Sequence, residues 1–130
     1  MMSAMAVILF GHGARDPEWS GPIERVRAAM LARQPELRVE LAFLEFMRPS
    51  LAEAVASLHA DACQQILIVP MFIAQGGHLK REVPQMIAEL RAAYPDADIM
   101  LAGVVGEAPG VTAAMAGFAL EQLAEMKRAP

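Results

Sequence analysis

The feature that most constrains the fold of this chain is a regular alternation between strand-like and helix-like apolar patterns. Four short apolar segments are predicted to be strands, and each is followed by a segment whose apolar residues recur at helical spacing. The predicted strands are MAVILF (5–10), LRVELAFL (37–44), ILIVPMF (66–72) and ADIMLAGVV (97–105). Four strand–helix units in succession predict an α/β fold: a four-stranded parallel sheet with helices on both faces.

The first two predicted helices carry recognisable start signals. The first is expected to begin near Ser20, with Pro22 close to its first helical position. Its apolar face is predicted to consist of Ile23, Val26 and Met30. The second begins with Ser50 and Glu53, which have the spacing of a capping box and therefore predict a helix start.

Two further helices complete the pattern. The third is predicted over 79–93, and Pro84 is expected to confine its start to a loose first turn, because proline has no backbone N–H. The fourth is predicted as an amphipathic helix over 108–127.

Length, composition and charge limit the class of protein. The 130 residues predict one domain over 1–130, with its core within about 5–125. Hydrophobic residues make up 55% of the chain, which favours strands buried on both faces or a buried subunit interface. A net charge of −4 without a block of like charge predicts no nucleic-acid partner. The single cysteine, Cys63, excludes an internal disulfide and is expected to be a small buried hydrophobe.

Membrane association is not expected either. No segment approaches the ~20 consecutive apolar residues that span a bilayer. The N-terminus has no basic region, and its apolar run is short for a secretory signal. We therefore expect a soluble, cytoplasmic protein.

Polar residues follow three of the predicted strands at the point where each strand ends. They are His12, Glu45 and His78. In open parallel sheets, ligands bind beyond the carboxyl ends of the strands. Two imidazoles and a carboxylate at one edge suit a divalent metal site or acid–base catalysis, and the spacing does not separate these roles. Each residue alone would equally suit a structural or surface position, so the prediction rests on the three together.

Both of these histidines are adjacent to glycines in the sequence. His12 lies between two glycines, and two more precede His78. The four residues are Gly11, Gly13, Gly76 and Gly77. Because glycine is costly to order, we interpret the pattern as backbone kept open for the close approach of a planar ligand.

Basic residues also follow the strand ends. Arg15, Arg48, Lys80 and Arg81 predict a basic rim at one edge of an acidic protein, although charge at helix starts is ordinary surface composition. Several common meanings of a glycine loop are excluded. Asp16 replaces the third glycine of a dinucleotide-binding motif, and the chain contains neither a P-loop GKS or GKT nor a GxSxG nucleophile elbow.

Three segments together resemble one family, the short CbiX-type sirohydrochlorin chelatases, which are class II, ATP-independent enzymes. The segments are VILFGHGARDP (7–17), AFLEFMRPSL (42–51) and VPMFIAQGGHLKREVP (69–84). They anchor a resemblance over roughly residues 5–125. The resemblance implies a homodimer and a lyase that inserts cobalt or iron into sirohydrochlorin, with no cofactor beyond the substrate metal.

The resemblance also assigns roles by position. His12 and His78 match the family's metal-binding histidines, and Glu45 matches its active-site carboxylate. The expected substrate-binding residues are Gly11, Gly13, Arg15, Gly76, Gly77, Lys80 and Arg81. The chain departs from the family pattern at three positions: Ala14 stands in place of serine, and Glu82 and Val83 stand in place of aspartate and isoleucine.

The residue types suit the implied reaction. Neutral imidazoles bind cobalt(II), iron(II) and nickel(II) yet can release them, and an incomplete ligand set leaves coordination positions open. A carboxylate can accept the pyrrole protons, and a basic rim would hold a macrocycle that carries carboxylates. The sequence leaves open the metal, the cobalamin or siroheme pathway, and a non-catalytic metal or tetrapyrrole carrier on the same fold. A nucleotide binder is disfavoured because its signature residues are missing.

Overall fold

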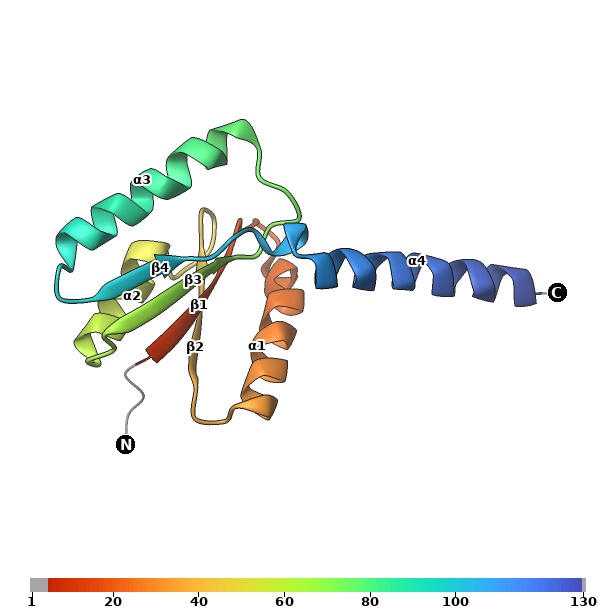
Figure 1. The fold of residues 1–130 in the computed structure, drawn as a ribbon, viewed down its shortest axis with the longest axis horizontal. Helices are drawn as coiled ribbons and strands as arrows, with labels where there is room; N and C mark the ends of the chain where they lie inside the picture. Colours follow the sequence, from red (N-terminus) through yellow and green to blue (C-terminus); the bar gives the residue numbers. More distant parts are fainter. Residues whose placement is uncertain (1–4, 130) are drawn as a thin grey trace.

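The apolar segments assemble into a single parallel sheet. A computed structural model of the protein describes residues 5–129. Their strands are β1 (Met5–Gly11), β2 (Arg38–Phe43), β3 (Gln65–Pro70) and β4 (Asp98–Leu101). The strand order is β2-β1-β3-β4, and all neighbours are parallel (Figure 1). The predicted fold class is confirmed.

Helices follow each strand, as predicted. The α-helices are α1 (Gly21–Arg33), α2 (Leu51–Ala60), α3 (Gly77–Ala93) and α4 (Pro109–Arg128). Two short 3₁₀ helices, η1 (Pro17–Ser20) and η2 (Val105–Glu107), precede α1 and α4. The fourth strand is shorter than the predicted 97–105: it ends at Leu101, and η2 occupies the end of the predicted range.

The core has two layers, one on each face of the sheet. On one face α2 and α3 pack over the sheet, and Val55 of α2 and Ile87 of α3 belong to one buried cluster with Ile68 of β3. On the other face α1 packs against β1 and β2, with Ile23 beside Leu9 and Val39. Helices therefore cover both faces, as predicted.

Two helix predictions are corrected by this packing. Val26 was expected on the apolar face of α1, but it is exposed, and Ile23, Met30 and Leu31 make that face instead. Pro84 is predicted to confine the start of α3 to a loose first turn, but the helix is continuous from Gly77 through the proline to Ala93. Proline removes one backbone hydrogen bond, and the burial of neighbouring apolar residues of α3 holds the helix together.

Two other local predictions are confirmed. Ser50 and Glu53 form the reciprocal capping box that starts α2: the Ser50 hydroxyl accepts from the Glu53 N–H, and the Glu53 carboxylate accepts from the Ser50 N–H. Cys63 is buried within the core on the α2 and α3 face.

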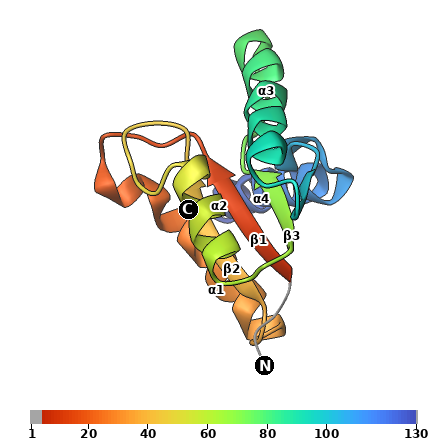
Figure 2. The same cartoon turned by 90° about the vertical axis from the view of Figure 1, so that its left-hand side faces the viewer.

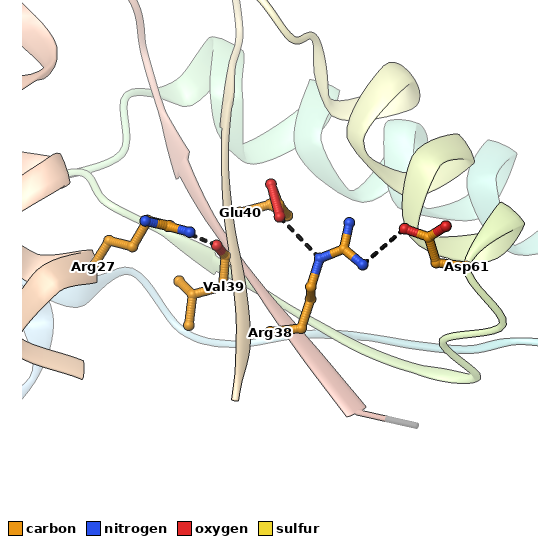
Figure 3. Close-up of polar contacts among 5 residues, drawn as sticks. All are labelled: Arg27, Arg38, Val39, Glu40 and Asp61. Carbon is orange, nitrogen blue, oxygen red and sulfur yellow. Dashed lines mark hydrogen bonds and ion pairs between the residues drawn. The ribbon is translucent and has the colours of Figure 1, made fainter. Parts of the chain in front are cut away.

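Arginines satisfy backbone carbonyls on both edge strands. Arg27 of α1 donates to the Val39 carbonyl of β2 at 2.7 Å (Figure 3), and Arg91 of α3 donates to the Ile99 carbonyl of β4 at 2.8 Å. Such contacts protect edges that would otherwise offer unpaired backbone groups.

Beside the first of these contacts, Arg38 bridges β2 to the end of α2. Its guanidinium lies between Glu40, at 2.9 Å, and Asp61, at 2.8 Å (Figure 3). Hydrogen bonds to these two carboxylates raise the pKa of Arg38 above its ordinary value, and the bond to Asp61 contributes more than the bond to Glu40.

The last helix is placed differently from the others. In Figure 1, α4 extends away from the sheet instead of lying along it, and none of its described residues is buried. A helix is present where the sequence predicts an amphipathic one, but its large apolar residues are spread around the helix, with Phe118 seven residues from Glu125, and none of its residues is part of the buried core. Within residues 5–129, no helix is both long and apolar enough to cross a membrane.

Candidate functional site

The loops that follow β1 and β2 meet at the carboxyl edge of the sheet. The Leu44 N–H donates to the Gly11 carbonyl at 2.9 Å, and the Glu45 N–H donates to the His12 carbonyl at 3.1 Å. These bonds extend the β1–β2 ladder, whose last paired residues are Gly11 and Phe43. Figure 2 shows the two loops side by side beyond the tips of the strands. The register of neighbouring strands therefore brings His12 and Glu45 together.

The two side chains form a direct contact. The Nε2 atom of His12 lies 3.0 Å from Oε1 of Glu45, and each side chain is 48% exposed. The imidazole and the Phe72 ring are packed at a steep angle, with 6.4 Å between ring centroids. The pair is thus held from two strands and a third loop, while about half of each side chain stays accessible to a ligand.

The glycines of this first loop have a structural explanation. Gly13 has a φ of +91°, a conformation that residues with a Cβ rarely adopt, and a Cβ there would overlap the carbonyl oxygen of Glu45. A Cβ on Gly11 would lie 2.7 Å from Ile23 Cδ1 and 3.3 Å from the Trp19 ring. These two glycines permit close packing within the chain. The interpretation that they keep the backbone open for a ligand is therefore wrong for this loop.

The glycines of the second loop have different surroundings. A Cβ at Gly76 or at Gly77 would meet no heavy atom within 4 Å. Gly76 is the N-cap of α3 and Gly77 its first residue, and both are exposed. Space beside the backbone, which the sequence predicts for both loops, is present at this one.

His78 does not join the first pair. It lies in the first turn of α3, and its Nε2 is 3.2 Å from Oε2 of Glu82, one turn further along the same helix. Its side chain is 77% exposed. Among residues 5–129, no group of three or more His, Cys, Asp or Glu side chains is arranged to hold a metal ion. The three-residue convergence expected from the sequence is therefore not formed within the single chain, because α3 starts early enough to include His78.

The predicted basic rim is only partly available. Arg15 lies over the Phe46 ring, with its Cζ 4.7 Å from the ring centroid. Arg48 instead forms an ion pair with Glu53 in the capping box of α2, and this contact lowers the pKa of Glu53 to about 2. Lys80 and Arg81 lie exposed in the first turns of α3. At this edge, the cations that form no ion pair with a carboxylate of residues 5–129 are Arg15, Lys80 and Arg81.

Two large apolar residues beside the site were not predicted from the sequence. Phe46 follows Glu45 directly, is 56% exposed and has a φ of +66°. Ile73 follows Phe72 and is 75% exposed. A non-glycine residue at positive φ costs of order 1–3 kcal/mol and is found preferentially at functional sites. The sequence feature that could have indicated Phe46 is a large apolar residue directly after a polar residue at the end of a strand.

The fold and this edge define an α/β protein whose site lies beyond the ends of parallel strands and contains a histidine–carboxylate pair. Comparison with known families is more specific. Residues 6–121 match the model of the CbiX family, so the chain belongs to that family.

Individual relatives agree with this assignment. A sirohydrochlorin cobaltochelatase from Saccharolobus islandicus (strain L.S.2.15 / Lassen #1) is 39% identical over 83 residues, which cover 64% of this chain and 63% of the relative. One from Methanococcus aeolicus is 32% identical over 82 residues, 63% of this chain and 57% of the relative. The chain thus spans less than two thirds of the length of these curated relatives.

Solved structures show the same fold. A CbiX protein from Marinobacter aquaeolei VT8 superposes with a TM-score of 0.82 at 29% identity, covering 93% of this chain and 98% of the other. The sirohydrochlorin chelatase SirB from Bacillus subtilis subspecies spizizenii, in complex with cobalt, superposes with a TM-score of 0.67 at 22% identity. That match covers 80% of this chain and 44% of SirB.

Proposed function

We propose that this protein is a chelatase, a lyase that inserts a divalent metal, cobalt or iron, into sirohydrochlorin. The proposal is supported by membership of the CbiX family and by relatives that carry the name sirohydrochlorin cobaltochelatase. The observation that carries it is the contact between His12 Nε2 and Glu45 Oε1 at the carboxyl edge of the sheet. The metal is a substrate here, and no further cofactor is proposed.

The His12–Glu45 pair supplies the two functions that metal insertion needs. An ionised carboxylate only accepts hydrogen bonds, so with Glu45 ionised the His12 Nε2 carries the hydrogen and donates it. The Nδ1 atom then has a lone pair for a metal ion or for a pyrrole proton. If the metal instead binds Nε2, the single ring hydrogen is carried by Nδ1, and the Glu45 carboxylate, released from its hydrogen bond to His12, can accept a pyrrole proton. Either route places a proton acceptor beside the metal ligand.

His78 is proposed as a second metal-binding residue that acts across the open loop after β3. Its high exposure and its contact with Glu82 alone leave the imidazole able to turn toward a ligand. The absence of a full ligand cage among residues 5–129 suits a site that must release its metal to a macrocycle with four nitrogens.

The side chains around the pair suit a flat, anionic substrate. The exposed faces of Phe46 and Ile73 offer apolar surface to a macrocycle. The Arg15 guanidinium, which lies over Phe46, is placed to meet peripheral carboxylates, and Lys80 and Arg81 extend the same positive edge. Gly76 and Gly77 leave the backbone of the second loop accessible. Gly11 and Gly13 contribute by holding the loop that carries His12.

The first test is a visible-absorption time course of sirohydrochlorin under anaerobic conditions, with cobalt(II) and iron(II) supplied separately. We expect wild-type protein to accelerate the spectral change over many turnovers, and His12→Ala and His78→Ala each to abolish the acceleration while the far-UV circular dichroism stays unchanged. His59→Ala is the matched control, because His59 lies at the end of α2 and contacts Asp96 at 2.9 Å, away from the proposed site.

The outcomes separate the possible functions. Full activity in both His12→Ala and His78→Ala would overturn the site assignment. A wild-type reaction no faster than the uncatalysed one with either metal would overturn the enzyme and favour a metal or tetrapyrrole carrier, which binds about one equivalent and stops. The more active metal would favour cobalamin or siroheme biosynthesis as the pathway.

We also propose that the protein acts as a homodimer in the cytoplasm, without a nucleic-acid or membrane partner. The homodimer is implied by the resemblance to short chelatases and is supported by the uncovered apolar side chains of α4. The cytoplasmic location stays a prediction from the sequence.

A further inference from the structure

Phe46 occupies a backbone conformation that a bulky residue rarely adopts. The Met47 N–H donates to the Glu45 carbonyl at 2.8 Å, so Phe46 is the central residue of a three-residue γ-turn. Its φ is +66°, which belongs to the rarer and more strained form of that turn. Glycine or asparagine is the usual residue at positive φ. Backbone geometry therefore does not explain why this residue is a phenylalanine.

Burial does not explain the phenylalanine either. Phe46 is 56% exposed and belongs to neither of the two buried clusters. Phe43, three residues earlier, shows the ordinary alternative: it is 5% exposed, and its ring lies 6.5 Å from that of Trp19, centroid to centroid. A strained aromatic residue that buries little of its surface contributes little to stability. Contact with a ligand is the better explanation, because strained residues concentrate at functional sites.

The surroundings of the turn hold Phe46 in place. The Glu45 N–H donates to the His12 carbonyl at 3.1 Å, which fixes the turn to the first loop. The Glu45 carbonyl, which accepts from Met47, also lies against Gly13: a Cβ there would be 1.9 Å from its oxygen. Figure 2 shows the two loops side by side. The contacts that bring Glu45 to His12 therefore also set the position of the Phe46 backbone.

Arg15 lies over the ring of Phe46. Its Cζ atom is 4.7 Å from the ring centroid, which is a cation–π contact. Within residues 5–129, no carboxylate forms an ion pair with Arg15. A guanidinium has several N–H donors in its plane, and contact with an aromatic ring leaves these donors without an acceptor. The side chain is thus held in place while its hydrogen-bonding groups stay available to an anionic ligand.

The chemistry of the proposed substrate matches this pair of side chains. Sirohydrochlorin is a tetrapyrrole macrocycle that carries carboxylates on its periphery. A flat π-system stacks on an aromatic ring in an offset arrangement, and a guanidinium binds a carboxylate through two parallel hydrogen bonds. Adjacent Cα atoms are about 3.8 Å apart, so a macrocycle on Phe46 lies within reach of the Glu45 carboxylate and of His12.

We propose that Phe46 is a macrocycle-binding residue: its ring stacks on the tetrapyrrole, and it holds Arg15 where the guanidinium meets a peripheral carboxylate. This inference rests on the proposed function and specifies how the substrate is recognised at that site. Phe46 determines the affinity for the macrocycle and takes no part in binding the metal. The strained turn has a function in this arrangement, because it presents the ring directly beside Glu45.

Binding of metal-free sirohydrochlorin measures the contact without turnover. Trp19 is the only tryptophan of the chain and lies beside Gly11 at this edge, so a bound macrocycle should quench its fluorescence by energy transfer. Phe46→Ala should weaken this binding roughly tenfold, because stacking and apolar contact are both lost. Phe46→Tyr keeps the ring and should bind within about threefold of wild type.

A second variant and a second ligand separate recognition from a structural role. Phe46→Gly removes the ring and also relieves the strain, because glycine adopts positive φ readily. It should lose macrocycle affinity as Phe46→Ala does, with an unchanged far-UV circular dichroism spectrum. The affinity of both variants for cobalt(II) alone, measured by calorimetry, should equal that of wild type. In the insertion assay the loss should appear in the KM for sirohydrochlorin and not in kcat.

Arg15→Gln tests the role given to the cation. It should weaken macrocycle binding roughly tenfold at low ionic strength, and the difference from wild type should shrink at about 1 M salt, where charges are screened. In the Phe46→Ala background the same substitution should have a smaller effect, because Arg15 has lost the ring that holds it. Arg33→Gln is the matched control: it removes the same charge from the last turn of α1 and should leave binding unchanged.

The outcomes separate this inference from the proposed function. If wild-type protein converts sirohydrochlorin, and Phe46→Ala and Phe46→Gly bind it as tightly as wild type does, the role of Phe46 is overturned and the enzyme stands. Equal losses of macrocycle affinity, cobalt affinity and kcat would make Phe46 a structural residue of its loop and would also overturn its role. Wild-type protein that binds without conversion would overturn the enzyme, and the same variants would still decide whether Phe46 contacts the macrocycle. Wild-type protein that does neither would overturn both.

Discussion

The chain contains two histidine–glutamate pairs at the same edge of the sheet, and they are built in different ways. His12 contacts Glu45 across two strands, so the pair depends on the register between β1 and β2. His78 contacts Glu82 within one helix, where residues four apart are neighbours in any helix. The first pair is a product of the fold, and the second is a product of local geometry.

The glycines beside the two histidines also differ: those in the first loop are required by packing within the chain, and those in the second loop are not. Gly13 has to be glycine because of its φ and its contact with the Glu45 backbone, whereas Gly76 lies in open space. Similar sequence patterns therefore have different physical causes. The first loop is held rigidly by packing, and the second leaves its backbone accessible.

The largest expected difference is between the same glycine-to-alanine substitution made in each of the two loops. Gly13→Ala should lower the free energy of unfolding by about 3 kcal/mol, because alanine is strained at positive φ and its Cβ overlaps the Glu45 carbonyl. Gly76→Ala should change it by less than about 1 kcal/mol, since the space is open. Urea unfolding followed by circular dichroism measures both, and equal losses would contradict the difference between the loops.

The next effect concerns the carboxylate of the first pair. Glu45→Gln should lower the rate of metal insertion by roughly 100-fold, because the amide cannot accept a proton. The affinity for cobalt(II), measured by calorimetry, should fall much less. A loss of affinity as large as the loss of rate would instead make Glu45 a metal ligand.

The second pair should respond weakly to the same change. Glu82→Gln should leave the insertion rate within about threefold of wild type, because exposed pairs four residues apart in a helix contribute only about 0.3–0.5 kcal/mol. The same sirohydrochlorin assay applies, with Glu45→Gln as the comparison. If Glu82→Gln were as damaging as Glu45→Gln, the distinction between the pairs would be lost.

The smallest effect tests the helix that follows the Glu45 loop. Contact with Arg48 lowers the pKa of Glu53 to about 2, so Arg48→Ala should raise it toward the ordinary 4.5. Because the folded-state pKa is depressed, the stabilisation is present above pH 4.5 and is lost as the pH falls toward 2. Carbonyl NMR titration measures the shift, and an unchanged pKa would show that the Ser50 N–H alone sets it.

The local features of this fold could be predicted from the sequence with few errors. The four strands, the capping box at Ser50 and Glu53 and the positions of His12, Glu45 and His78 after strands follow from periodicity and short-range chemistry. Two of the wrong predictions are local. Val26 was placed on the wrong side of α1, and Pro84 was given more influence over the start of α3 than the helix allows.

Which segments form strands and which form helices follows from the order of residues along the chain, because backbone geometry makes the period of apolar residues a local property. The strand order β2-β1-β3-β4, and with it the pairing of His12 with Glu45, depends on how the folded segments pack. It also placed His78 apart and left α4 without a core to join. These outcomes depend on which apolar surfaces bury one another, and that choice is made by packing among segments far apart in the chain.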